Sequence, residues 1–193
     1  MCHGFVCELC RQQDTKGKAM RMAITGHTSG IGEALFKRYS PAAVGFSRSN
    51  GFDISDAACR AAIVDMSSQC DVFINNAHDG FHQVDLLYDM QEAWKNTDRL
   101  IINISSNSGD GIKRTPHRYA VCKSALDKAA EQLSRIDGSC RIATIRPGYV
   151  DTPRVKHVAD QPKVSVDSIV RCVDMLIEWP ADSMINNITI LPR

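Results

Sequence analysis

The feature that most constrains this chain is a regular alternation of short β-branched runs with segments of helical periodicity. The expected strands are nearly continuous apolar runs, which is typical of a parallel sheet covered on both faces. Right-handed crossovers between such strands give a doubly wound α/β domain. The pattern therefore predicts one domain over residues 20–193, with strands at 21–26, 42–49, 71–77, 99–106, 140–150 and 186–192 and helices at 31–40, 56–68, 84–96, 118–136 and 166–179. Ser55 is a candidate N-cap for the second helix.

The composition excludes several classes of function. A formal net charge of +1 over 193 residues gives no reason to expect nucleic acid or an anionic membrane as a partner. No apolar run approaches the roughly 20 residues that a membrane span needs, and the N-terminus lacks the pattern of a signal peptide. We therefore expect a soluble, cytoplasmic protein that acts on a small molecule.

Residues 1–19 stand apart because they are polar and rich in cysteine. We interpret them as a disordered tail or an upstream reading-frame artefact, since methionines at 20 and 22 immediately precede the first expected strand. Known zinc sites usually combine two separated ligand pairs, so the single cluster of Cys2, His3, Cys7 and Cys10 is not expected to bind a metal. The other cysteines are expected to be free thiols.

A glycine-rich turn, TGHTSGIG at 25–32, joins the first expected strand to the first expected helix. Gly26 allows a tight turn, while Gly30 and Gly32 let the backbone approach a phosphate and let the helix pack on the strand. The N–H groups and the positive dipole end at the start of a helix favour a pyrophosphate. Glycines alone would indicate only a strand–helix turn, but their position between a strand and a helix favours a dinucleotide site.

The spacing of this turn resembles that of the short-chain dehydrogenase/reductase family, and four further motifs follow in the family's order. NNA at 75–77 resembles its Asn-Asn-Ala-Gly motif, with His78 in place of the glycine. NISS at 103–106, Tyr119-x-x-x-Lys123 and RPGYVDTP at 146–153 resemble the catalytic-serine strand, the catalytic pair and the segment that closes over the nicotinamide. The resemblance covers residues 22–192 and implies a shortened, divergent member with a Rossmann-type sheet. It implies cofactor contacts from Thr25, Gly26, Thr28, Ser29, Gly30, Ile31, Gly32, Asn75, Asn76, Ala77, Tyr119, Lys123, Pro147, Gly148, Val150 and Thr152.

The end of the second expected strand bears on the choice of cofactor. Family members that use NAD usually carry an acidic residue there, whereas this chain has Ser47 followed by Arg48. A guanidinium can bind a 2′-phosphate bidentately, so NADP(H) is expected to be preferred, with NAD(H) possible. The alternative is that Arg48 is a solvated charge at a strand end. By resemblance, Asp53 and Ile54 would flank the adenine, although this segment also begins a helix.

The implied chemistry is proton transfer coupled to hydride transfer. An unperturbed phenol, with a pKa near 10, needs a neighbouring cation to act near neutral pH. Lys123 lies one helical turn from Tyr119 and supplies that charge. The resemblance implies that Lys123 also binds the nicotinamide ribose and that Ser106, rather than Ser105, orients the substrate oxygen.

The chain departs from the family where a catalytic asparagine is normally supplied, because that segment is missing. If the deletion lies after His78, Gln83 occupies the position of the asparagine, with His82 beside it. Gln83 can donate or accept through its amide, and His82 can titrate near neutrality. The alternative for both is a surface position at a helix start. The segment past Thr152 is also short, which implies an open active site or one that a partner chain covers.

The leading hypothesis is an NADPH-dependent carbonyl reductase, or an alcohol dehydrogenase acting in reverse. An alternative is a dinucleotide-binding regulatory or scaffold protein of the same fold with weakened catalysis, and a third is epimerisation or dehydration of a nucleotide-sugar. The family resemblance implies a homo-oligomer. We expect a homodimer, with a tetramer possible, and a small-residue interface formed by Ala125, Leu126, Ala129, Ala130 and Leu133.

Overall fold

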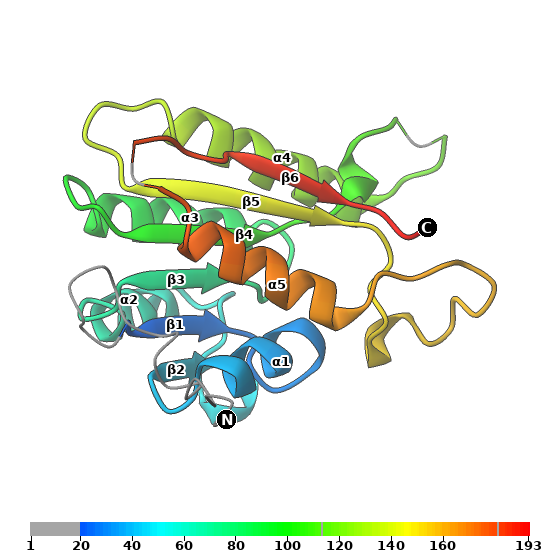
Figure 1. Cartoon of the computed structure of the whole chain (residues 1–193), viewed down its shortest axis with the longest axis horizontal. Helices are drawn as coiled ribbons and strands as arrows, with labels where there is room; N and C mark the ends of the chain where they lie inside the picture. The colour runs from blue at the N-terminus through cyan, green and yellow to red at the C-terminus, as the bar shows by residue number, and fades with distance from the viewer. Residues whose placement is uncertain (1–19, 113, 181) are drawn as a thin grey trace, which may run out of the picture.

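The computed structural model describes residues 20–112, 114–180 and 182–193. The cysteine-rich extension, with its candidate metal ligands, lies outside the described residues. Within them, the fold is a six-stranded parallel sheet in the order β2-β1-β3-β4-β5-β6, which confirms the predicted doubly wound, Rossmann-type architecture (Figure 1). The strands are β1 (Met22–Thr25), β2 (Ala43–Phe46), β3 (Val72–Asn75), β4 (Leu100–Ile104), β5 (Arg141–Pro147) and β6 (Asn187–Ile190).

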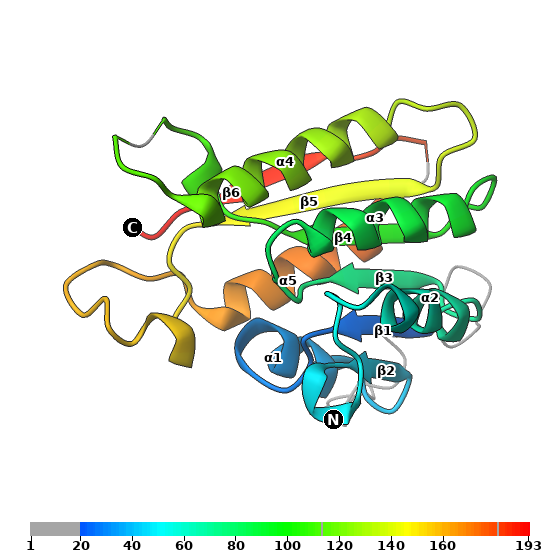
Figure 2. The same cartoon turned by 180° about the vertical axis from the view of Figure 1, so that it is seen from behind.

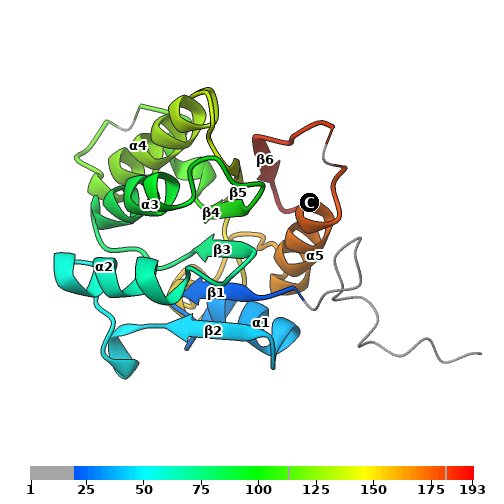
Figure 3. The same ribbon diagram turned by 90° about the vertical axis from the view of Figure 1, so that its left-hand side faces the viewer.

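Helices cover both faces of the sheet. One face carries α1 (Gly30–Tyr39) and α5 (Val166–Ile177). The other carries α2 (Ala57–Met66), α3 (His82–Ala93) and α4 (Arg118–Leu133), as Figure 2 shows from behind. Figure 3 shows the sheet between these two layers. Within the described ranges, three short 3-10 turns join these elements: η2 (Arg48–Asn50), η3 (Asn107–Gly109) and η4 (Pro153–Val155).

The alternation of side chains along each buried strand supplies both layers of the core. In β4, Ile102 packs with the helices on one face, while its neighbour Ile101 packs with those on the other. Successive strand residues point to opposite faces, so a continuous apolar run fills both cores. In the core beneath α2, α3 and α4, the ring of Trp94 lies edge-on to that of Phe73.

Several expected boundaries and caps differ from the structure. The predicted N-cap Ser55 is wrong: Asp56 caps α2 by accepting from the N–H of Ala58, while Ser55 bonds to Asp53. The second strand ends at Phe46, because the chain turns at once into the 3-10 turn after it.

The predicted dimer face is wrong for four of its five residues, whereas the fifth, Ala125, is partly exposed. Leu126, Ala129, Ala130 and Leu133 of α4 are buried in the core against the sheet, with no more than 6% of any of them exposed. The small and apolar side of an amphipathic helix covers its own sheet first, so these four side chains are not available to a partner subunit. A homo-oligomer stays a prediction without an assigned surface.

The fold fixes where a ligand can bind. The chain passes from β1 to β2 on one side and returns to β3 on the other, so the strand order reverses between β1 and β3. In open α/β sheets, ligands bind outside the carboxyl ends of the strands at such a switch point. Among the described residues, no helix is long and apolar enough to cross a membrane. The five described cysteines are free thiols, as predicted, and four of them are buried.

Candidate active site

The glycine-rich turn after β1 is closed by its backbone contacts. Gly26 has a φ of +70°, and a Cβ on Gly32 would lie 2.1 Å from the carbonyl oxygen of Gly26. No other residue type fits at position 32 while the turn keeps this shape. Ser29, the N-cap of α1, makes no side-chain cap hydrogen bond, so the first N–H groups of α1 remain available to an anion.

Two polar residues predicted to contact the cofactor instead hold the loops in place. The hydroxyl of Thr25 accepts from the N–H groups of Asn76 (2.9 Å) and Ala77 (3.0 Å). The amide nitrogen of Asn75 donates to the backbone oxygen of Gln83 (2.9 Å). Thr25 and Asn75 are fully buried and, like Gly32, line neither of the two cavities at the carboxyl ends of the strands.

Two adjoining cavities lie at the carboxyl ends of the strands. The larger, of about 680 Å³, lies over β4, β5 and α4, and the smaller, of about 450 Å³, lies over β1 and β2. They meet at Ile31, Asn76, His78, Thr152 and Arg154, which line both. Predicted cofactor residues that line one or both are Gly26, Thr28, Ser29, Gly30, Ile31, Ser47, Arg48, Asp53, Ile54, Asn76, Ala77, Tyr119, Lys123, Pro147, Gly148, Val150 and Thr152.

The wall of the smaller cavity has one exposed cation at the end of β2. Ser47 is buried, and its N–H and hydroxyl both bond to the side-chain oxygen of Asn50. This closes the turn and leaves Arg48, its first residue, exposed on the cavity wall. Asp53 lines the same cavity, and hydrogen bonds from the N–H and hydroxyl of Ser55 lower the pKa of its carboxyl.

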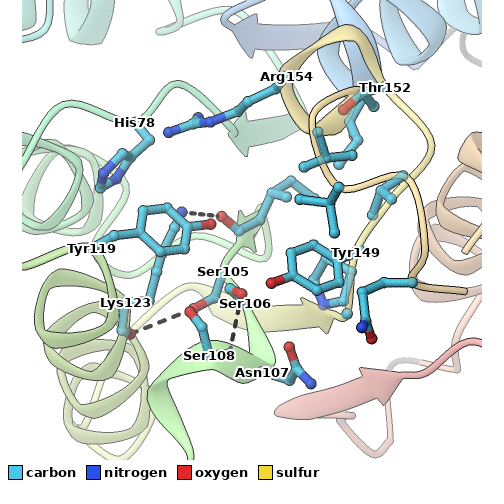
Figure 4. A pocket seen from close by; sticks show the side chains of 18 of the residues that line it. His78, Ser105, Ser106, Asn107, Ser108, Tyr119, Lys123, Tyr149, Thr152 and Arg154 are labelled. Carbon is cyan, nitrogen blue, oxygen red and sulfur yellow. Dashed lines mark hydrogen bonds between the residues drawn. The ribbon is translucent and has the colours of Figure 1, made fainter. Parts of the chain in front are cut away.

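The three predicted catalytic residues line the larger cavity together (Figure 4). Ser106 follows β4, and its hydroxyl oxygen accepts from the N–H of Ser108 (3.1 Å), so its hydrogen remains available to a ligand. The hydroxyl of Ser105 instead donates to the backbone oxygen of Lys123 (3.5 Å). Tyr119 lies in the first turn of α4, with the Lys123 ammonium 5.5 Å from its ring centroid.

Lys123 is a buried cation held by two acceptors. Its ammonium donates to the side-chain oxygen of Gln83 (2.8 Å) and to the backbone oxygen of Ile104 (2.9 Å). Only 2% of the residue is exposed. Burial, reinforced by the charge of Arg154, lowers the pKa of Lys123 to about 7.

Of the two candidates for the missing asparagine, the structure brings Gln83 to the lysine. Gln83 is 1% exposed, and its amide donates to the backbone oxygens of Asn75 (2.7 Å) and Ile104 (3.2 Å). The surface interpretation is therefore wrong for Gln83. It is right for His82, whose exposed ring faces Asp85 at 3.2 Å and lines neither cavity.

Two residues beside Tyr119 were not among the predicted site residues. The ring of His78 lies edge-on to that of Tyr119 at 4.8 Å, and the guanidinium carbon of Arg154 lies 5.5 Å from the same ring (Figure 4). Burial, with the charges of Lys123 and Arg154, lowers the pKa of His78 to about 4, so its ring is neutral at pH 7. The sequence offers a reason to examine His78, because it replaces the family's glycine. Nothing in the local sequence pattern indicates that Arg154 belongs to the site.

Comparisons with known proteins agree with this architecture. The sequence matches no protein-family model and no curated protein. A 4-hydroxyisoleucine dehydrogenase complexed with NADH superposes with a TM-score of 0.76 at 18% identity, over 90% of this chain and 97% of that one. An alcohol dehydrogenase from the archaeon Thermococcus sibiricus, complexed with 5-hydroxy-NADP, gives 0.69 at 19% identity, over 89% and 96%. A short-chain dehydrogenase from Burkholderia cenocepacia J2315 in complex with NADP gives 0.68 at 18% identity, over 90% and 88%. The chain therefore has the short-chain dehydrogenase/reductase fold.

Proposed function

We propose that this chain is a short-chain dehydrogenase/reductase that uses NADP(H) to reduce a carbonyl group or, in reverse, to oxidise an alcohol. The observation that carries the proposal is the joining of two sites. Ser106, Tyr119 and Lys123 line one cavity, and it adjoins a second cavity formed by the glycine-rich turn. A structural tyrosine–lysine pair would need neither the serine nor the adjoining cavity.

The residues of the two cavities fit a nicotinamide dinucleotide. The start of α1 and the turn before it suit a pyrophosphate, and the smaller cavity would take the adenosine half. When bound, the cofactor supplies or accepts a hydride. Lys123, which lines the larger cavity, would hold the ribose next to the nicotinamide.

The side chains of this site each have a separate role in reduction. Ser106 donates a hydrogen bond to the carbonyl oxygen, and Tyr119 delivers the proton that this oxygen needs as hydride reaches the carbon. The Lys123 ammonium stabilises the phenolate that remains on Tyr119, since an opposite charge nearby favours the ionised form. Gln83 keeps that ammonium in place by accepting a hydrogen bond from it.

The proposal is tested by following NADPH oxidation with a panel of aldehydes, ketones, quinones and pterins. We expect turnover with at least one class, and tight NADPH binding in a fluorescence titration. Tight binding without turnover on any class would contradict the enzyme proposal and favour the regulatory or scaffold alternative. Weak binding of both NADPH and NADH would contradict a dinucleotide site altogether.

The preference for NADP(H) rests on the exposed guanidinium of Arg48 at the end of β2. We expect Arg48→Gln to weaken NADPH binding about 10- to 100-fold, the usual effect of losing a charge-assisted hydrogen bond to phosphate. NADH, which lacks the 2′-phosphate, should bind within about twofold of its original Kd, since no such bond is lost. Fluorescence titrations of both cofactors measure this.

A matched control is Arg171→Gln, which removes an exposed guanidinium from α5, away from both cavities. It should leave both affinities unchanged. Equal affinity of the original protein for NADH and NADPH would contradict the preference. A homo-oligomeric state and a cytoplasmic location stay predictions that rest on the sequence.

A further inference from the structure

The walls of the larger cavity carry charge of one sign. The charged residues that line it are Lys123 and Arg154. The imidazoles of His78, His117 and His157 line it as well, and that of His78 is neutral at pH 7. Among the residues that the structure describes, no aspartate or glutamate lines this cavity. A cavity with such walls attracts anions and repels cations.

Arg154 differs from several other arginines of the fold, each of which pairs with a carboxylate. Arg60 pairs with Asp89 at 3.3 Å, and Arg146 pairs with Asp127 at 3.0 Å. In the described part of the chain, Arg154 forms no ion pair with any carboxylate. Its guanidinium instead lies 5.5 Å from the ring centroid of Tyr119.

Of the two cations near Tyr119, neither Lys123 nor Arg154 therefore forms an ion pair with a carboxylate of the described residues. Lys123 is desolvated, and the charge of Arg154 lowers its pKa further. The carboxylate of Asp127 raises the pKa of Lys123, but it forms its ion pair with Arg146. A negatively charged ligand in the larger cavity would stabilise both cations at once.

We propose that the substrate carries a carboxylate close to its reacting carbon, and that Arg154 binds this carboxylate. The substrates are then 2- or 3-oxo acids in the direction of reduction and the corresponding hydroxy acids in reverse. Hydride adds to the carbonyl carbon, the proton of Tyr119 adds to its oxygen, and NADPH becomes NADP⁺, while the carboxylate is unchanged. This inference rests on the proposed function and specifies the substrate class of the same site.

A phosphate of the cofactor is the other anion that Arg154 could bind, because this residue lines both cavities. Two observations favour the substrate. The guanidinium lies over the ring of Tyr119, whose hydroxyl delivers the proton (Figure 4). The start of α1 already offers free N–H groups to a pyrophosphate. The experiment distinguishes the two sources.

The test compares oxo acids with their neutral esters: 2-oxobutanoate and acetoacetate against the two methyl esters. We expect the original protein to favour the acids about 10- to 100-fold in kcat/KM, as expected for a charge-assisted hydrogen bond. Arg154→Gln should remove this preference by raising KM for the acids much more than KM for the esters, while the Kd for NADPH stays within about twofold. Arg48→Gln is the matched control, because it should weaken NADPH binding and keep the preference for acids.

A second measurement does not depend on turnover. In the presence of NADP⁺, 2-hydroxybutanoate should raise the Tm of the original protein but not that of Arg154→Gln, because a ligand stabilises only the protein that binds it. Reduction of esters or neutral aldehydes as fast as acids would overturn the inference and leave the proposed function standing. Stabilisation by the hydroxy acid without turnover would support carboxylate binding and contradict the proposed enzymatic function. Loss of NADPH affinity in Arg154→Gln with the preference kept would assign the guanidinium to the cofactor and overturn the inference.

Discussion

Replacing Tyr119 with phenylalanine is expected to lower kcat for carbonyl reduction about 10²- to 10⁴-fold while NADPH binds as before. The substitution removes the phenolic hydroxyl and leaves the ring. The ring keeps its edge-on contact with His78 and its place beside the Lys123 ammonium and the Arg154 guanidinium. Steady-state kinetics and NADPH fluorescence, measured on the same preparation, separate loss of chemistry from loss of binding.

The matched control for this variant is Tyr149→Phe. Tyr149 lines the same cavity, but it is 49% exposed and follows β5, without an ammonium against its ring in the described structure. Removing its hydroxyl should change kcat much less than removing that of Tyr119. If Tyr119→Phe kept most of the original rate, another group would deliver the proton, and the catalytic assignment would be wrong.

The fold was predictable because its determinants are local in the sequence. Each buried strand, such as β4, is a short apolar run, and the turn at Gly26 is written in consecutive residues. Parallel pairing and the position of the site at the switch between β1 and β3 then follow from general rules of α/β sheets. The order of the motifs along the chain supplied the candidate catalytic residues in the same way.

What the sequence could not specify depends on contacts between distant segments. Gln83 is buried because Asn75, Ile104 and Lys123, from two strands and one other helix, converge on its amide. Such a residue has the local pattern of a helix-start surface position, and only the packing of α3 on α4 shows otherwise. Arg154 is a similar case, since η4 carries it back over the ring of Tyr119.

The α4 face predicted to form a dimer fails for a related reason. A run of small and apolar residues on one side of a helix is equally suited to a partner subunit and to the helix's own sheet. Leu126 and Ala130 lie in the core with β4 and β5, which decides between the two. Periodicity identifies the buried side of a helix but not what buries it.

Gln83→Leu should lower kcat/KM for reduction about 10- to 100-fold and shift its pH profile. The variant keeps the volume of the side chain but removes the oxygen that accepts from the Lys123 ammonium at 2.8 Å, and a hydrogen bond to a charged group is worth about 1.5–3 kcal/mol. The pKa of Lys123, already lowered to about 7, should fall further, because the charged form loses an acceptor. Reduction depends on the ammonium, so the rate should begin to decline at a lower pH than in the original protein. Measuring kcat/KM from pH 5 to pH 9 tests this, because the pH at which the rate declines should fall by as much as the pKa of Lys123 does.

Two further variants separate positioning of Lys123 from general damage to α3. Gln83→Glu supplies a charged acceptor, which should raise the pKa of Lys123 and move the decline to higher pH. Gln91→Leu removes another buried glutamine, about two turns further along α3 and away from both cavities, and should leave the profile where it was. Opposite shifts for Gln83→Leu and Gln83→Glu cannot come from loosened packing, because both lose the same amide donors to Asn75 and Ile104. Shifts in the same direction, or none, would show that Gln83 only supports the fold and that Lys123 is held by the backbone of β4 alone.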